Sequence, residues 1–355
     1  MQGWFHTEIP KKVENVILDS VKKKHFTNGP ETVTLEKLFE EKLKVKHALY
    51  TNSGTSALAM SLLSLDIGEG DEVIVPSIGW IATAQAVMMT GAKPIIVDTE
   101  ERHSNISLED LTNKISSRTK AIIPVNYNGR QVDIKKIKNK LSKNIFIVED
   151  SCKSMFSRSH DGKSFSGTNG DCGCFSLGMI SMLPSCYGGI VITNNSDIFE
   201  KLKLIKYHGV SYKPETYRYK SFNFKTTNLL ASMGVEMFKT IDERIKNLIN
   251  IYEIYEKAFK GTKYRLIPVN IDKGEIPLLI DVYRDDFNNK EIIEYLEKEN
   301  IPTLGYHPSL SSAKYLHPVK TPNSDWLTSR TFHLPCGPDQ KLENIEKAIE
   351  VILKF

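Results

Sequence analysis

The sequence predicts an α/β protein in which helices cover both faces of a mixed, largely parallel sheet, followed by a smaller α+β unit. Short runs of nearly continuous apolar residues indicate strands that are buried on both faces. These runs are Glu72–Val75, Pro94–Val97, Ala121–Val125, Ile145–Val148, Cys174–Leu177 and Gly189–Ile192. Helical stretches at 56–63 and 82–89 lie between them, and this alternation is typical of layered α/β folds.

The character of the chain changes after about residue 233. A charged helical stretch over 242–260 leads into Ile276–Val282, which has the pattern of a strand. Two further amphipathic helices are expected at 289–298 and 342–353. We therefore expect a large domain over residues 1–238 and a smaller α+β domain over residues 239–355.

Composition narrows the range of functions. Hydrophobic residues make up 40% and charged residues 25% of the 355 residues, as in an ordinary globular protein. The net charge of +4 gives no reason to expect nucleic acid or an anionic membrane as a partner, and no apolar run is long enough to span a bilayer. The N-terminus lacks the apolar segment of a secretory signal. Five scattered cysteines without companion ligands argue against a disulfide framework and a metal site, so we expect a reduced, cytoplasmic protein.

Several polar or aromatic residues stand at strand ends and helix starts, where α/β proteins place ligands. Gly54-Thr55 opens a predicted helix, whose free N–H groups and hydroxyl can hold phosphate or simply cap the helix. Asp150 ends a strand, where a carboxylate can keep a pyridinium nitrogen protonated or cap the next loop. The ring of Trp80 can stack on a cofactor or pack in the core. Ser176 can offer its hydroxyl to phosphate.

The order and spacing of these motifs resemble those of the DegT/DnrJ/EryC1/StrS family of nucleotide-sugar aminotransferases over nearly the whole chain. The matching stretches are Thr27–Pro30, Val45–Ala48, Asn52–Thr55, Gly70–Ser77, Gly91–Pro94, Arg118–Val125, Glu149-Asp150, Gly173–Ser176, His208-Gly209, Asn223 and Leu334-Pro335. The resemblance implies a fold-type-I aminotransferase fold and a pyridoxal 5′-phosphate or pyridoxamine 5′-phosphate cofactor. It also implies a nucleotide-linked keto-sugar substrate in deoxy-sugar, amino-sugar or surface polysaccharide biosynthesis.

The resemblance also implies a role for each matching residue. The phosphate contacts would be Gly54, Thr55 and Ser176. Trp80 would stack on the cofactor ring, and Asp150 would pair with the pyridine nitrogen. Asn223 matches the asparagine of a loop that is lent across a subunit interface to the neighbour's phosphate, which implies a homodimer with shared active sites.

The pattern departs from the family at the catalytic position. In the family, a lysine follows the Gly-Cys-Phe-Ser stretch after four intervening residues. The same count from Gly173–Ser176 leads to Ser181, and no lysine occurs between Lys163 and Lys201. A serine hydroxyl cannot form a Schiff base and is a poor base without an activating partner. Ordinary transamination through a lysine aldimine is therefore excluded if Ser181 is the true equivalent.

Other departures lie near the same site. Lys153 stands where the family has Gln or His beside the cofactor's phenolic oxygen. Lys225, Asn228 and Ser221 replace an arginine, an aspartate and a glycine of the family pattern.

Three hypotheses follow. In the first, the cofactor is held noncovalently, as in a family branch that performs sugar 3-dehydration with a histidine base, and Lys153 or His307 supplies the base. In the second, the protein binds a nucleotide sugar for cofactor-independent chemistry or a regulatory role. In the third, the pocket is structural only. The joint presence of the cofactor-contact residues argues against this third hypothesis. We expect an enzyme of the first kind, with candidate catalytic residues Ser181, Lys153 and His307.

Overall fold

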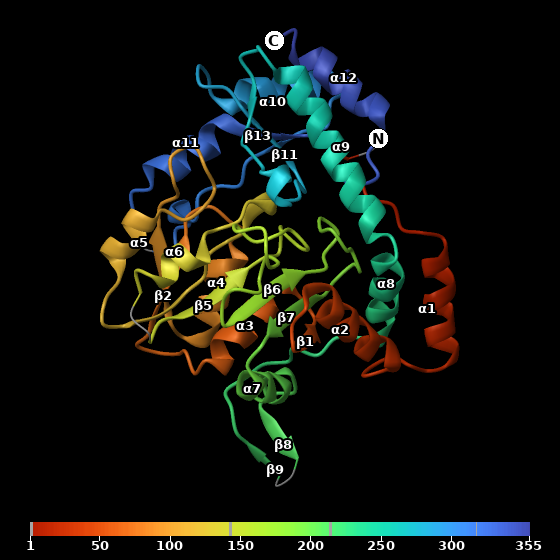
Figure 1. Ribbon diagram of the computed structural model, residues 1–355, viewed down its shortest axis with the longest axis vertical. Helices are drawn as coiled ribbons and strands as arrows, with labels where there is room; N and C mark the ends of the chain where they lie inside the picture. The colour runs from red at the N-terminus through yellow and green to blue at the C-terminus, as the bar shows by residue number, and fades with distance from the viewer. Residues whose placement is uncertain (1–2, 142–143, 213–214, 317) are drawn as a thin grey trace.

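The computed structural model describes residues 3–141, 144–212, 215–316 and 318–355, and its largest element is a seven-stranded sheet (Figure 1). The strand order is β1-β7-β6-β5-β4-β2-β3. Neighbours from β3 to β6 pair in parallel, whereas β7 runs antiparallel to both β1 and β6. The strands are β1 (His47–Thr51), β2 (Glu72–Pro76), β3 (Lys93–Val97), β4 (Thr119–Ile122), β5 (Phe146–Asp150), β6 (Cys172–Ser176) and β7 (Gly189–Thr193). The predicted mixed α/β sheet is confirmed.

Helices cover both faces of this sheet because successive strand residues point to opposite sides. In β2, Val73 and Val75 join the core under α3, α4 and α7, whereas Ile74 joins the core under α5 and α6. A third core lies under α2, α8 and α9. The helices of this part are α1 (Lys12–Lys22), α2 (Pro30–Leu43), α3 (Gly54–Ser64), α4 (Ala82–Thr90), α5 (Leu108–Lys114), α6 (Ile134–Lys138), α7 (Ser196–Lys206) and α8 (Asn228–Phe238).

The C-terminal part contains a second, antiparallel sheet of four strands in the order β10-β11-β13-β12. The long helix α9 runs from beside α8 up to this sheet (Figure 1). The elements are α9 (Ile241–Phe259), β10 (Arg265–Leu266), β11 (Ile280–Tyr283), α10 (Asn289–Lys298), β12 (Leu304–Gly305), α11 (Pro322–Arg330), β13 (Thr331–Leu334) and α12 (Leu342–Ile352). The proposed domain boundary after residue 238 falls between α8 and α9 and stays a prediction.

The N-terminal segment packs on this second sheet. The rings of Trp4 and His333 stack with centroids 5.3 Å apart, and Phe5 forms a parallel β-bridge with Cys336. The Glu8 N–H donates to the Asp339 carboxylate across a sequence separation of 331 residues. Residues 4–8 therefore pack against residues 333–339 of the C-terminal part.

The structure differs from the sequence expectations in several places, including three that involve strands. The expected strand 276–282 is ordered as a strand only from Ile280, because the preceding segment contains a proline and bonds to a loop, where Leu279 N–H donates to Asn128 Oδ1. Similarly, β4 ends at Ile122 rather than at residue 125. A hairpin of β8 (Val210–Tyr212) and β9 (Glu215–Tyr217) was not expected, and it projects beyond α7 (Figure 1). None of the helices in the described ranges is both long and apolar enough to cross a membrane.

Candidate active site

The carboxyl end of β5 carries Asp150 into a junction of several elements. Asp150 is buried, with 5% of its surface exposed. One carboxylate oxygen accepts from the Thr83 hydroxyl of α4 at 2.8 Å, and the other accepts from the Cys152 N–H at 3.1 Å. A carboxylate offers about four acceptor positions, so Asp150 can accept further hydrogen bonds. The strand end, α4 and the following turn together hold this side chain in place.

The start of α3 lies against the ends of β5 and β6. Ser53 caps the helix, because its hydroxyl accepts from the Ser56 N–H and its carbonyl from the Ala57 N–H, both at 3.0 Å. The first two N–H groups of the helix, those of Gly54 and Thr55, have no acceptor within the helix. They form the kind of helix terminus that binds anions.

Close packing explains the glycine at this helix start. A Cβ atom on Gly54 would lie 2.9 Å from Cys152 Sγ and 3.0 Å from Ser176 Cβ, which is closer than such atoms normally approach. The Ser176 hydroxyl is partly exposed beside it and accepts from the Gly178 N–H at 3.3 Å. Gly54 and Ser176 therefore form one compact corner, in which Thr55 is next along the helix.

Trp80 and His307 approach each other from the two parts of the chain. Trp80 lies between β2 and α4 with 59% of its surface exposed, and its ring meets His307 edge to face at 4.9 Å. Burial, together with the neighbouring His333 and Lys153, lowers the pKa of His307 to about 4, although Asp281 favours the charged form. His307 is consequently a neutral imidazole at pH 7 and can accept or relay a proton.

Lys153 is half-buried three residues after Asp150. Its Nζ donates to the Ile180 carbonyl at 2.5 Å. Burial lowers the pKa of Lys153 to about 8, although Cys152 and Asp150 favour the charged form. About a tenth of the Lys153 side chains would be neutral amines at pH 7, compared with about 0.04% for a free lysine.

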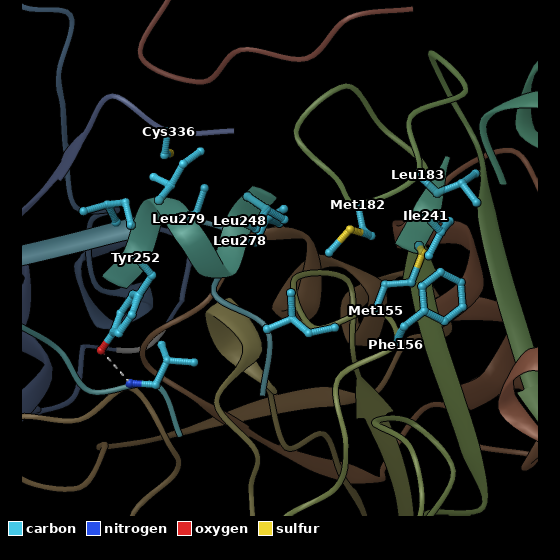
Figure 2. Close-up of a cluster of buried hydrophobic side chains, with 14 of the residues drawn as sticks. Met155, Phe156, Met182, Leu183, Ile241, Leu248, Tyr252, Leu278, Leu279 and Cys336 are labelled. Atoms are coloured by element: carbon cyan, nitrogen blue, oxygen red, sulfur yellow. Dashed lines mark hydrogen bonds between the residues drawn. The ribbon is translucent and has the colours of Figure 1, made fainter. Parts of the chain in front are cut away.

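Ser181 is adjacent in the chain to the carbonyl that Lys153 contacts. Its side chain is completely buried, and its hydroxyl donates to the Gly178 carbonyl at 2.7 Å. Within the described residues no base is hydrogen-bonded to this hydroxyl, so the structure gives Ser181 a part in shaping the loop. Figure 2 shows Met182, next to Ser181, beside Met155, which holds the loops of Ser181 and Lys153 together through apolar packing.

A buried polar network lies beside the candidate site and links the two parts of the chain. Arg130 Nη1 donates to Asp281 Oδ2 at 2.6 Å, and both side chains are at most 1% exposed. His333 Nδ1 lies 2.9 Å from Asp281 Oδ1, and Asn128 Nδ2 donates to Oδ2 at 2.8 Å. Burial opposes ionisation of Asp281, but Arg130 and His333 outweigh it and hold the pKa of Asp281 below its ordinary value. The network joins the Tyr127–Gly129 turn to β11 and β13.

The sequence was compared with models of known protein families. The model of the DegT/DnrJ/EryC1/StrS aminotransferase family matches residues 7–353. The chain belongs to this family. Members include proteins that act on nucleotide sugars, as the names of several relatives state.

Three similar proteins illustrate the family. The GDP-perosamine synthase of Escherichia coli O157:H7 is 34% identical over 328 residues, which cover 90% of this chain and 88% of that protein. Helicobacter pylori PseC, an aminotransferase of pseudoaminic acid biosynthesis, has a TM-score of 0.91 at 23% identity, covering 100% of this chain and 99% of PseC. A GDP-4-keto-6-deoxymannose-3-dehydratase mutant with bound GDP-perosamine has a TM-score of 0.89 at 20% identity, covering 99% and 100%.

Of the residues that the family resemblance singled out, Asn223 contacts the candidate site only through Asn52, two residues before Gly54, in the hydrogen bonds of the described residues. It is exposed, its carbonyl accepts from Asn52 Nδ2 at 3.2 Å, and its Oδ1 accepts from the Lys225 N–H at 3.3 Å. It borders a surface groove with lysines of α7 and residues of the 27–33 segment. Within the described residues, its hydrogen bonds do not connect it to Asp150 or Lys153. Its predicted role at a neighbouring subunit's site stays a prediction.

Sequence reasoning missed the residues that hold the DegT-family site in shape. Thr83 could have been found, because it lies on the first turn of α4, three residues after Trp80. The Arg130–Asp281–His333 network had no local signal, since its members are separated by about 150 and 50 residues. Such long-range partners emerge only from the fold.

Proposed function

We propose that the protein is a pyridoxal- or pyridoxamine-phosphate-dependent enzyme acting on a nucleotide-linked keto-sugar, in deoxy-sugar, amino-sugar or surface polysaccharide biosynthesis. The observation that carries the proposal is that a strand-end carboxylate, a helix terminus and an exposed indole all lie at the carboxyl ends of strands of the large sheet. Asp150, Gly54 and Trp80 provide these three features. Membership of the family and the 34% identity to a GDP-perosamine synthase support the substrate class.

The residues present fit the cofactor. The N–H groups of Gly54 and Thr55 with the Ser176 hydroxyl would hold the phosphate, and the tight corner at Gly54 has no room for a side chain. Asp150 would hold the ring nitrogen, and Trp80 would cover the ring face. When bound, the protonated ring would supply an electron sink for removal of a proton beside the sugar's nitrogen.

The chain's own groups would then bind, orient and move protons. The Asp150 charge would keep a proton on the ring nitrogen, and Thr83 would hold that carboxylate in its orientation. The Lys153 amine, whose pKa is lowered to about 8, would accept and return a proton at neutral pH. His307, a neutral imidazole beside Trp80, would be the second base. No covalent bond would form to residue 181, because serine cannot make one of this kind.

We also propose that two copies assemble with shared sites. Large apolar side chains near the groove of Asn223 are well exposed, among them Phe26 at 47%, Val33 at 51% and Phe222 at 41%. Exposed apolar residues gathered in this way are typical of protein interfaces. Light scattering would give the mass of the assembly. A monomer whose cofactor affinity is unchanged by Asn223→Ala would contradict shared sites.

The structure also supports a second candidate function, because the Ser181 hydroxyl donates to the Gly178 carbonyl and is thereby given a structural part in its loop. In this alternative, the protein binds a nucleotide sugar without cofactor chemistry, or regulates an active relative. It would predict binding of GDP- or dTDP-linked keto-sugars and no binding of either cofactor form.

The deciding experiment is a titration with pyridoxamine phosphate and with pyridoxal phosphate, followed by absorbance. Tight binding is expected for the wild type. Asp150→Asn is expected to weaken it, since the isosteric amide keeps the shape but removes the charge. Asp161→Asn, an exposed aspartate on another loop, serves as the matched control and should leave binding unchanged. Absence of binding by the wild-type protein would refute the proposed function and favour the alternative.

A further inference from the structure

We infer that the ε-amino group of Lys153 is the amine that binds the aldehyde form of the cofactor covalently, in place of a lysine at position 181. The inference rests on the proposed cofactor-dependent function and adds to it the identity of the anchoring residue. It is carried by the contact of Lys153 Nζ with the loop of Ser181 and by the turn that places Lys153 directly after the strand of Asp150.

The backbone of Lys153 is fixed close to Asp150. The Lys153 carbonyl accepts from the Gly129 N–H at 2.9 Å. The Cys152 N–H donates to Asp150 Oδ1, and the Ser154 N–H closes a turn on the Ser151 carbonyl at 3.1 Å. The lysine side chain therefore starts from a rigid turn immediately after the strand that carries Asp150.

The tip of the Lys153 side chain ends beside residue 181. Nζ lies 2.5 Å from the Ile180 carbonyl oxygen. That oxygen and the Ser181 Cα belong to one planar peptide unit. The amine of Lys153 thus lies next to the backbone from which a lysine at position 181 would begin.

Packing keeps the two loops at this separation. Lys153 and Met182 border one small hollow, together with Met155 and Leu278. Figure 2 shows Met182, Met155 and Leu278 in a single apolar cluster. From α9, Arg244 Nε donates to the Met182 carbonyl at 3.0 Å, which fixes the loop of Ser181 on its other side. The Nζ position is consequently defined by the surrounding core.

The surroundings also favour the nucleophilic form of this amine. The ionisable groups that face it are Asp150 and Cys152 on its own segment, Cys336 after β13, and His307 after β12. Burial outweighs the acidic neighbours and lowers the pKa of Lys153 to about 8. The neutral amine is then about 200 times more abundant at pH 7 than in a free lysine.

The other candidates cannot take this role. Ser181 has no nitrogen, and the neutral imidazole of His307 forms no stable imine. Lys163 is exposed on a different loop, and the sequence offers no lysine from there to Lys201.

The chemical step balances without an oxidant or a reductant. The neutral Lys153 nitrogen adds to the aldehyde carbon, so that a carbon–nitrogen bond forms and the carbon–oxygen bond breaks. The oxygen leaves as water and takes both amine protons with it. An incoming primary amine can displace Lys153 by the reverse exchange, which returns the lysine as a free amine. The chain would thereby keep a route to amino transfer despite Ser181.

The test is reductive trapping of the full-length protein. The protein is incubated with pyridoxal phosphate, reduced with borohydride, digested and mapped by mass spectrometry. The expected result is a stoichiometric adduct on the peptide that contains Lys153, formed faster as the pH rises through about 8. An adduct on another lysine would overturn the inference, and so would cofactor binding with no adduct.

Two variants separate this inference from the proposed function. Lys153→Gln should abolish the adduct while the protein still binds pyridoxamine phosphate, which needs no covalent bond. Lys163→Ala, the matched control, should leave the adduct in full. If Lys153→Gln retains a stoichiometric adduct, the inference fails while the proposed function stands. If the wild type binds neither form of the cofactor, the proposed function fails and the inference fails with it.

Discussion

Removing the charge of Arg130 should strongly destabilise the protein, because it would leave Asp281 ionised and without its main partner in the interior. Arg130 is 1% exposed and makes three hydrogen bonds, to Asp281 Oδ2 at 2.6 Å, the Ile267 carbonyl at 2.8 Å and the Pro268 carbonyl at 2.9 Å. Breaking one partner of a buried ion pair costs about 3–5 kcal/mol. Folded domains have only about 5–15 kcal/mol in total. Arg130→Met should therefore lose a large share of the free energy of unfolding.

The assay is equilibrium unfolding in urea, followed by circular dichroism. Lys42→Met is the matched control, because Lys42 pairs with Asp242 at 2.9 Å across the surface between α2 and α9. Exposed pairs of this kind contribute about 0–1 kcal/mol. The double variant Arg130→Met with Asp281→Asn removes the stranded charge and should be more stable than Arg130→Met alone. If Arg130→Met lowers the free energy of unfolding no more than Lys42→Met does, Arg130 and Asp281 are not an energetically coupled buried pair.

The same pair sets a pH dependence with a definite sign. The folded-state pKa of Asp281 lies below its ordinary value, so the unfolded chain binds its proton at a higher pH than the folded protein does. The stabilisation from the ionised carboxylate is therefore complete above about pH 4 and is lost as the pH falls toward the folded-state pKa. Asp281→Asn should flatten the acid limb of a plot of unfolding free energy against pH. An unchanged acid limb would contradict the result expected for Asp281.

Three further predictions concern the site itself. Gly54→Ala should lower the free energy of unfolding by about 1–3 kcal/mol through overpacking against Cys152 and Ser176, and should weaken phosphate-ester binding. Gly68→Ala should do neither, because a Cβ there meets only an ordinary contact at 3.7 Å. Equal melting temperatures for the two variants would count against the tight corner at Gly54. The imidazole of His307 should titrate near pH 4 in an NMR series, with its signal assigned by loss in His307→Gln, and a midpoint near 6.5 would show that the ring is not desolvated. Competitive acetylation of Lys153 should rise with a midpoint near pH 8, and a midpoint near 10.4 would remove the basis for its role as a base.

The sequence was sufficient for the parts of the fold whose signals are local. β2 and β7 were found because every residue in them is buried and their centres, Val73–Val75 and Ile190–Ile192, consist of β-branched residues. By contrast, the apolar centre of β1, at 48–50, contains no β-branched residue, and β1 becomes a strand through its antiparallel register with β7. The hairpin of β8 and β9 lacks the alternation of apolar and polar residues that would have predicted it.

The same division holds at the candidate site. Asp150, Gly54 and Ser176 were predicted because each ends or opens a recognisable element; the structure brings Gly54 against Ser176, and the roles of the three residues stay predictions. The contact between Lys153 and the Ile180 carbonyl could not be foreseen, because it depends on how two irregular loops pack on Met155 and Met182. Loop conformations are set by tertiary contacts that leave no periodic pattern in the chain.

The position of the N-terminal segment imposes an order on the making of the protein. Trp4 stacks on His333 and Phe5 bridges to Cys336, so this segment can take its place only after residues 333–336 have been synthesised. At about 5–20 residues per second, the ribosome needs roughly 15–70 s to cover the 331 residues between Glu8 and Asp339. During that interval the large sheet can form, whereas the second sheet lacks the segment that closes over His333. Completion of the Arg130–Asp281–His333 network and of its cover by Trp4 therefore has to wait for synthesis of the His333 segment.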